Sequence, residues 1–463
     1  MKQIILFGVA GSLLLLSACT NISAVDNSMQ QPSLADNWQL QSQYLAVQGN
    51  WLDEFKQPEL QVLVEKALRQ NHALLQQAYQ TEIEQQKVEA SGAALWPSLD
   101  FSLRSTRSKS AELSTYLTSN AASLDVSYEV DLWGKLSAAQ RQAKLTYLAQ
   151  KSSFEQAKQQ LVADVVVAWF NQLSAKHLLS LYQSRVNNAE QNLDIIEKGY
   201  QQGLNAALDV YLARNNLNSE RSRLSQQQAN YLDSIRTLER LLGDYPKGQL
   251  AIDADIPLIS NDIPVGLPSE LITRKPQLIA SWYQLLAKDA ALAYAHKQRF
   301  PSLNLNASLS DSSDSLADVF SPTSLAWSLI GSISAPIFQG GKLKANENIA
   351  LLTLKQSEQQ YLDALYSAFN TVESTLTQQN SLSERYQSTL AAAENALIAE
   401  QLSFEQYRSG LVSYTTVLDA QGRSYDAQSA LIDLKNQLIA NRVKLHVALG
   451  GDFSLPNNSK SEN

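Results

Sequence analysis

The sequence has few of the residues that usually carry metal or redox chemistry. It holds one cysteine, four histidines and two methionines, one of them Met1. The histidines lack the spacing of a metal site, and no second cysteine can join them or close a disulfide. Two methionines are too few to line a copper path. These absences argue against a metalloenzyme. The histidines are His72, His177, His296 and His446.

Nucleotide and nucleic-acid signatures are missing as well. Gln339-Gly340-Gly341-Lys342 ends like a phosphate-binding loop, but Pro336 stands where the required first glycine belongs. The 45 acidic residues outnumber the 37 basic ones without a basic patch, which argues against nucleic acid as a partner. Glycine and proline are too scarce for a disordered chain, while 44% apolar residues can bury a core. We therefore expect a folded protein that is not an enzyme.

The first eighteen residues have the pattern of an export signal. Lys2 supplies a positive charge, residues 4–16 an apolar stretch too short to span a membrane, and Ser17-Ala18 the small residues before a cleavage site. The only cysteine, Cys19, follows at once. An ordinary secretion signal followed by an incidental free thiol is one reading of this pattern.

Leu16-Ser17-Ala18-Cys19 also resembles the lipobox of bacterial lipoproteins. This resemblance implies that Cys19 becomes the first residue of the mature chain and carries diacylglycerol and an N-acyl chain. Thr20 is not the aspartate that tends to retain such lipoproteins at the inner membrane. Outer-membrane sorting is therefore expected.

The second half of the chain repeats the first at an offset slightly above 200 residues. Trp-Pro-Ser-Leu at 96–99 returns as Phe-Pro-Ser-Leu at 300–303, an offset of 204. The Tyr-x-x-Gly-Leu motif at 200–204 returns at 407–411, an offset of 207. A backbone plan that is kept twice normally serves a symmetric assembly.

Long segments between these landmarks have apolar residues at sevenfold spacing. A strict seven-residue period predicts coiled-coil helices with a left-handed supercoil. One helix over 134–200 would be about 100 Å long at roughly 1.5 Å per residue. The heptad positions are Phe154, Leu161, Ala168, Ala175, Tyr182, Ala189 and Ile196 in the first half, and Leu362, Phe369, Leu376, Leu390, Leu397 and Phe404 in the second.

A pair of alternating apolar and polar segments precedes each long helix. Segments of about ten residues with this period are typical of outer-membrane barrel strands. Four strands cannot close a barrel, for which about eight are needed, whereas three copies would supply twelve. Two soluble hairpins packed on a core are the alternative, although they leave the long helices unexplained. The apolar positions begin Leu99, Phe101, Leu103; Leu124, Val126, Tyr128; Leu303, Leu305, Ala307; and Leu325, Trp327, Leu329.

Together these features resemble an outer-membrane efflux channel of the TolC and OprM type, in the lipoprotein (NodT-like) branch. The resemblance covers nearly the whole mature chain. It implies an α+β membrane protein, a homotrimer whose long helices form an α-barrel tunnel and whose strands share a 12-stranded barrel in the outer membrane. The implied partners are outer-membrane lipid, a periplasmic adaptor protein and an inner-membrane RND-type pump. The residues that carry the resemblance are Cys19, 51–60, the two Pro-Ser-Leu strand starts, 274–277, 338–342 and 410–421.

The duplication and the resemblance divide the chain into six parts. The predicted boundaries are 1–18 (signal peptide); 19–58 (lipid-anchored segment); 59–243 (first repeat, with a helix, a strand pair 98–132, a long helix 134–200 and a returning helix 204–243); 244–269 (equatorial linker); 270–450 (second repeat, with a helix, a strand pair 301–337, a long helix 340–407 and a returning helix 411–450); and 451–463 (tail).

The resemblance also implies roles for the two Gly-Leu turns, which face the adaptor in the family. We expect the docking tips at Gly203, Leu204, Gly410, Leu411 and Val412. For the glycines, a simple helix stop explains the pattern equally well. An apolar leucine at a loop tip is harder to explain without a partner.

The family's gate lies at the same end. Asp419 falls on the gating aspartate, where three copies around an axis would concentrate negative charge, and Asp209 and Tyr407 fall on a hydrogen-bonded pair. Asp209 could instead stabilise a helix N-terminus, which is worth roughly 0.3–1 kcal/mol. Two positions depart from the family: Thr416 replaces a second acidic ring, and Gly422 replaces an arginine.

The function expected from these features is the exit duct of a small-molecule efflux system. A duct for protein secretion uses the same architecture and is the first alternative, against which lipidation argues only by analogy. The second alternative is a non-transporting coiled-coil lipoprotein scaffold, against which the amphipathic strands argue.

Overall fold

The computed structural model describes residues 35–39, 51–109, 116–259, 265–319 and 325–451. The predicted signal peptide, Cys19 and the tail from 452 lie outside the described residues. Of the described helices, none combines the length and the apolar character that a membrane crossing needs.

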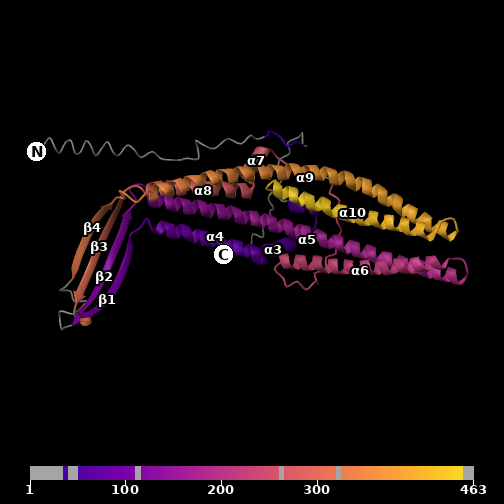
Figure 1. The fold of residues 1–463 in the computed structure, drawn as a ribbon, viewed down its shortest axis with the longest axis horizontal. Helices are drawn as coiled ribbons and strands as arrows, with labels where there is room; N and C mark the ends of the chain where they lie inside the picture. Colours follow the sequence, from indigo (N-terminus) through magenta and orange to yellow (C-terminus); the bar gives the residue numbers. More distant parts are fainter. Residues whose placement is uncertain (1–34, 40–50, 110–115, 260–264, 320–324, 452–463) are drawn as a thin grey trace. The chain divides into compact units, whose positions relative to one another are not determined.

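Figure 1 shows the elements: α3 (Pro58–Gln70), α4 (His72–Ala93), β1 (Ser98–Lys109), β2 (Tyr116–Val130), α5 (Lys135–Gln201), α6 (Ala207–Leu241), α7 (Pro268–Arg274), α8 (Pro276–Lys297), β3 (Ser302–Ser313), β4 (Ala326–Ser334), α9 (Lys342–Arg408) and α10 (Tyr414–Ala448), with short 3-10 helices at Trp51–Phe55 and Leu316–Asp318.

The chain divides into two compact units, and both repeats contribute to each. The first unit includes residues 80–151 and 280–363, and it contains all four strands. The second unit includes 33–79, 152–279 and 364–463, and it contains α6, α10 and most of the two long helices. The predicted architecture, a duplicated chain of long helices and four antiparallel strands, is therefore confirmed.

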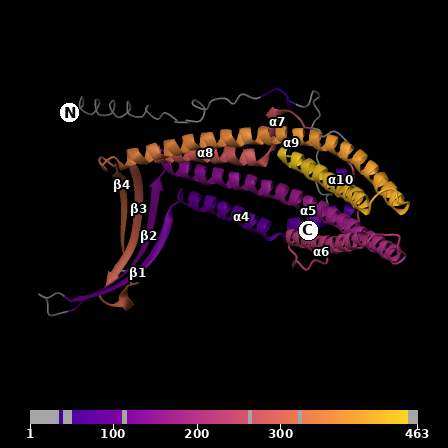
Figure 2. The ribbon, with the colours of Figure 1, turned by 45° about the vertical axis from the view of Figure 1, so that its right-hand side comes forward.

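The four strands form one antiparallel sheet in the order β1-β2-β3-β4, as both Figure 1 and Figure 2 show. β2 and β3 come from different repeats and pair from Asn120–Ser313 to Val130–Leu303. The hairpin ladder between β1 and β2 continues to Lys109 and Tyr116, beyond the alternating residues that predicted it. Main-chain hydrogen bonds do not require an alternating sequence, so the strands extend beyond the alternating residues.

The register aligns the apolar residues of all four strands on one face. Phe101 lies opposite Leu124, Leu124 opposite Leu309, and Leu309 opposite Trp327. These four side chains are all exposed, Trp327 to 79%. Because successive side chains in a strand point to opposite faces, the other face is polar, with Asp100, Asp125 and Ser308 in one row. The sheet thus presents a continuous exposed apolar surface.

The long helices and the returning helices have equal lengths in the two repeats. α5 and α9 each have 67 residues, and α6 and α10 each have 35. The returning helices begin at Ala207 and Tyr414, three residues after the predicted starts at 204 and 411. The reason is that the backbone N–H groups of Leu204 and Leu411 still bond back to the preceding helices.

The first helix of repeat one is two helices, because Asn71 interrupts it. The Asn71 Oδ1 accepts a hydrogen bond from the backbone N–H of Leu74 at 3.0 Å, and its Nδ2 donates to the Leu241 carbonyl at 2.9 Å. An asparagine that satisfies the free N–H groups of a helix start favours such a break. α3 and α4 therefore replace the single helix expected from residue 59.

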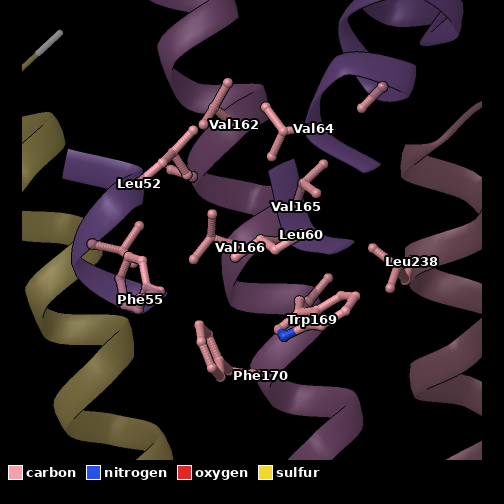
Figure 3. Packing of buried hydrophobic residues seen from close by; sticks show 14 of the residues in the cluster. Leu52, Phe55, Leu60, Val64, Val162, Val165, Val166, Trp169, Phe170 and Leu238 are labelled. Atoms are coloured by element: carbon pink, nitrogen blue, oxygen red, sulfur yellow. The ribbon is translucent and has the colours of Figure 1, made fainter. Parts of the chain in front are cut away.

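The main core of the second unit surrounds the middle of α5 (Figure 3). Val162, Val165, Val166, Trp169 and Phe170 of α5 are each 0–1% exposed. They pack against residues of the Trp51–Phe55 helix, α3 and α6, which are Leu52, Phe55, Leu60, Val64 and Leu238. Burying one such side chain contributes about 1.5–3 kcal/mol, so this cluster is a main source of the unit's stability.

Candidate functional site: the helix turns and the gate

The two Gly-Leu turns have the same backbone geometry. The Leu204 N–H donates to the Gly199 carbonyl at 2.8 Å, and the Gly203 N–H donates to the Tyr200 carbonyl at 3.0 Å. Gly410 and Leu411 repeat both bonds at 2.9 Å. This pair of backbone hydrogen bonds ends a helix whose next residue adopts the left-handed conformation. Gly203 (φ 74) and Gly410 (φ 72) are those residues. The glycines are accounted for by backbone geometry alone.

The leucines that follow these glycines are not explained by the turn. Leu204 is 76% exposed and Leu411 is 74% exposed. In this kind of turn the second residue often covers an apolar side chain of the preceding helix. Here the positions it would cover are Gly199 and Gln406, which offer no such contact. Val412 is half-buried. Figures 1 and 2 show both turns at the same end of the second unit, so two exposed leucines mark that end.

Asp209 and Tyr407, the two residues predicted to form a hydrogen-bonded pair at the gate, lie close together. The Tyr407 hydroxyl donates a hydrogen bond to the Asp209 carboxylate at 3.2 Å, joining α9 to the first turn of α6. Burial raises the pKa of Tyr407, and the negative charge of Asp209 raises it further. Tyr407 therefore keeps its proton and remains a donor at any physiological pH.

Tyr414, which was not predicted from the sequence, lies beside the Tyr407–Asp209 pair. Its ring is 1% exposed and lies 5.4 Å from that of Tyr407, centroid to centroid. Burial, followed by the charge of Asp209, raises the pKa of Tyr414 to about 12. Its hydroxyl is buried without a hydrogen-bond partner among the described residues. Spacing gave no signal for this contact, because Tyr407 is in α9 and Tyr414 begins α10 after the turn.

Asp419 lies one turn from an arginine of the same helix. The Arg423 Nε is 3.1 Å from the Asp419 carboxylate, and both side chains are largely exposed. Thr416 makes a local contact instead, with its hydroxyl 3.2 Å from that of Ser413. Arg423 therefore offsets the negative charge that Asp419 contributes, and the i, i+4 spacing in the sequence was the signal that could have revealed this pair.

Outside the gate, a charged cluster around Glu54 is structural. No group of three or more His, Cys, Asp or Glu side chains that could hold a metal occurs among the described residues. Glu54 binds Arg442 at 2.7 Å and His446 at 3.2 Å, while Trp51 stacks on His446. Burial raises the pKa of Glu54, but the hydrogen bonds from His446 and Arg442 prevail and lower it to about 2. These contacts hold the Trp51–Phe55 helix against α10.

Comparison with known proteins identifies the family. The family model described as "Outer membrane efflux protein" matches residues 63–244 and 267–451, one match for each repeat. The chain belongs to the outer membrane efflux protein family. The predicted family and the predicted outer-membrane efflux channel are thereby confirmed, and the channel is not an enzyme. The same result sets aside the non-transporting scaffold.

Several relatives resemble the channel over most of its length. The probable outer membrane lipoprotein SilC of Salmonella typhimurium is 29% identical over 409 residues, which cover 87% of this chain and 88% of SilC. The toluene efflux pump outer membrane protein TtgI of Pseudomonas putida is 29% identical over 416 residues, 87% of each chain. A crystal structure of CusC superimposes with a TM-score of 0.82 at 25% identity and covers 91% of this chain and 98% of CusC. The channel is an outer-membrane protein of this family.

Proposed function

We propose that the chain is the exit duct of a tripartite efflux system and that it works as a homotrimer. The observation that carries the proposal is the sheet: four strands share one exposed apolar face, and β1 and β4 are its two edges. An exposed edge strand leaves a row of N–H and C=O groups unpaired, which is untenable in lipid. Pairing β4 of one copy with β1 of the next satisfies both edges, and three copies close a 12-stranded barrel.

The exposed leucines at the turns support docking of a periplasmic adaptor. Leu204 and Leu411 lie at the end of the second unit that carries both turns, and an adaptor with an apolar hairpin tip would cover them. Gly203, Gly410 and Val412 shape this surface through the backbone. In this proposal an inner-membrane pump of the RND type, bound through the adaptor, supplies the energy for transport.

Contacts at the end that carries the two Gly-Leu turns hold the duct closed. The Tyr407–Asp209 bond joins helices of different repeats and holds the hairpins together. Asp419 lines the constriction in this proposal, with Arg423 beside it, and Thr416 contributes no charge there. Opening requires the Tyr407–Asp209 bond to break.

A lipid on Cys19 anchors the chain to the outer membrane. Trp38, nineteen residues later, is buried in the second unit and donates a hydrogen bond from its Nε1 to the Gly266 carbonyl at 3.1 Å. It also contacts Phe369 edge to face. A segment of that length can extend at most roughly 65 Å, so the acyl chains stay tethered near the folded protein.

Dye efflux tests the proposal. Cells that lack the gene are preloaded with a fluorescent dye, energised, and complemented with the wild type or with Leu204→Asp/Leu411→Asp. We expect rescue by the wild type and none by the tip variant, although its trimers form normally. Tyr245→Asp is the matched control, because Tyr245 is 78% exposed at the opposite end of α6 and should rescue fully.

The same assay tests whether the cargo is a small molecule. Relatives of similar identity are named for toluene and for cations, and we infer from this diversity that the pump selects the cargo. Unchanged dye efflux in the deletion strain, with trimers present in the wild-type outer membrane, would contradict the small-molecule role. The search would then turn to exported proteins, the cargo of the secretion alternative.

A further inference from the structure

A buried ion pair lies in the second unit, well away from the gate residues. The Arg185 side chain on α5 and the Glu220 side chain on α6 are 1% and 5% exposed. The Arg185 Nη2 donates to Glu220 Oε1 at 2.8 Å, and its Nε is 2.7 Å from Oε2. Arg223 approaches Glu220 at 3.0 Å from the more exposed side. α5 and α6 are thus tied by a nearly dry ion pair with one hydrogen bond, because the Nε and Oε2 atoms are close but not aligned for a second one.

The same arginine also binds the second repeat. Its guanidinium lies between two tyrosine rings, 4.5 Å from the centroid of Tyr182 on α5 and 4.5 Å from that of Tyr425 on α10. The Asn188 Nδ2 on α5 donates to the Tyr425 hydroxyl at 3.1 Å. Stacking on aromatic faces suits the flat guanidinium and not an ammonium. Arg185 therefore joins the α5–α6 hairpin to α10.

The fourth helix joins through Glu400 on α9. Burial raises the pKa of its carboxyl group, and the nearby Ser424 and Tyr425 of α10 act in the opposite direction, as does the positive charge of Arg185. Ser424 is fully buried and Tyr425 is 7% exposed. All four helices meet in one polar cluster, which we call the Arg185 collar: Tyr182, Arg185, Asn188, Glu220, Glu400, Ser424 and Tyr425.

Separating the helices costs more free energy at the Arg185 collar than at the Tyr407–Asp209 pair. Moving α10 away from α5 would lift the Tyr425 ring off the Arg185 guanidinium and break the Asn188–Tyr425 hydrogen bond. Both contacts lie beside a buried ion pair that stays within the α5–α6 hairpin, and bringing water to a buried charge cluster of this kind requires its rearrangement. The Tyr407–Asp209 contact is one hydrogen bond between half-buried groups, and water can replace it. The collar resists opening, and the gate does not.

Along α5, Arg185 precedes Gly203 by eighteen residues, about 27 Å at roughly 1.5 Å per residue. We propose that Arg185 is a positioning residue that holds the four helices together through the whole transport cycle. Opening is then confined to the helix ends between the Arg185 collar and the two Gly-Leu turns. This inference rests on the gate placed at those turns under the proposed function.

Reversible cross-linking tests it. Cys19 is the only natural cysteine, so engineered thiols can be paired selectively with a short bis-methanethiosulfonate and released with a reductant. One variant carries Asn188→Cys and Tyr425→Cys at the collar, and the other Asp209→Cys and Tyr407→Cys at the gate. Each is compared with itself before and after cross-linking, so the loss of the natural side chains cancels.

We expect cross-linking to abolish dye efflux in the gate variant and to leave it unchanged in the collar variant. Lost efflux in the cross-linked collar variant would overturn the inference, because the collar would then have to open. Unchanged efflux in the cross-linked gate variant would instead refute the gate, whatever the collar variant does. The two failures are therefore distinguishable.

A second variant tests the positioning role without a cross-link. Arg185→Met/Glu220→Leu replaces the pair with apolar side chains of similar volume, so trimers should still form. We expect entry of large antibiotics to rise at least tenfold, and we expect cross-linking of Asn188→Cys to Tyr425→Cys in that background to reverse the rise. A purely structural role would lower trimer stability without a leak that the cross-link reverses, and that result would also overturn the inference.

Discussion

The Tyr407 hydroxyl donates to the Asp209 carboxylate at 3.2 Å, and this bond has no symmetric twin in the duplication. At the 207-residue offset, the counterparts are Tyr200 and Thr416. Tyr200 is 49% exposed, and the Thr416 hydroxyl contacts Ser413. Aspartate occupies this position in the first repeat only, so the hydrogen bond between the two repeats is not duplicated.

Tyr407→Phe should loosen the closed state. The variant keeps the ring and removes only the donor, which costs the closed form about 1–2 kcal/mol and shifts its population roughly five- to thirty-fold. The measurement is uptake of a large antibiotic by cells that carry the variant. Tyr200→Phe is the control and should leave uptake unchanged. Equal leaks in both variants would show that the hydrogen bond does not hold the gate.

Arg423→Gln should strengthen block of the channel by polyvalent cations. Without Arg423, the Asp419 carboxylates lose their neighbouring positive charge, and a ring of such groups attracts cations. Conductance in planar bilayers, titrated with hexaamminecobalt(III), checks this. The melting temperature should hardly change, because an exposed pair contributes only about 0–1 kcal/mol. Arg408→Gln makes the same charge change near the tip and should not alter the block; equal effects would rule out a specific pairing.

Acid should weaken the clamp between Glu54 and α10. The pKa of Glu54 falls from 4.5 to about 2 on folding, so its stabilising contribution is fully present above pH 4.5 and disappears as the pH falls toward 2. Glu54→Gln takes the carboxylate away from Arg442, which is 3% exposed, and should cost roughly 1.5–3 kcal/mol near neutral pH.

Thermal unfolding of wild type and Glu54→Gln across pH tests this clamp. The gap between the two should close between pH 4.5 and about 2. Glu65→Gln removes a carboxylate 3.7 Å from the exposed Arg69 and serves as the control, with little change expected at any pH. A gap that stays constant through this range would contradict the assigned pKa.

Cys19→Ser should abolish incorporation of radiolabelled palmitate, because the acylated thiol is then missing. Labelling followed by immunoprecipitation measures it. Thr20→Ser leaves the thiol in place and should label normally. An unlabelled wild type would mean that the export signal is an ordinary one and that the lipid anchor is absent. Label retained in Cys19→Ser would mean that the acyl chains are attached to another residue.

The sequence by itself determined the plan of the protein. Repeated landmarks predicted the duplication, and sevenfold spacing predicted the long helices α5 and α9. Alternation predicted strands whose apolar residues share a face, because side chains in a strand alternate strictly. Spacing along one element is a local property, and residues of one element are enough to read it.

Only the tertiary structure decided which distant residues meet. Arg185 and Glu220 are 35 residues apart, and Arg185 and Tyr425 lie in different repeats. Their contact depends on the register between antiparallel helices, which is set by the length of each turn and by packing along the whole hairpin. The contact of Tyr414 with Tyr407 escaped for the same reason, as did the bond from Asn71 to the Leu241 carbonyl of α6. Heptad spacing assigns a residue to a face of its helix, but the partner opposite that face is chosen by the fold.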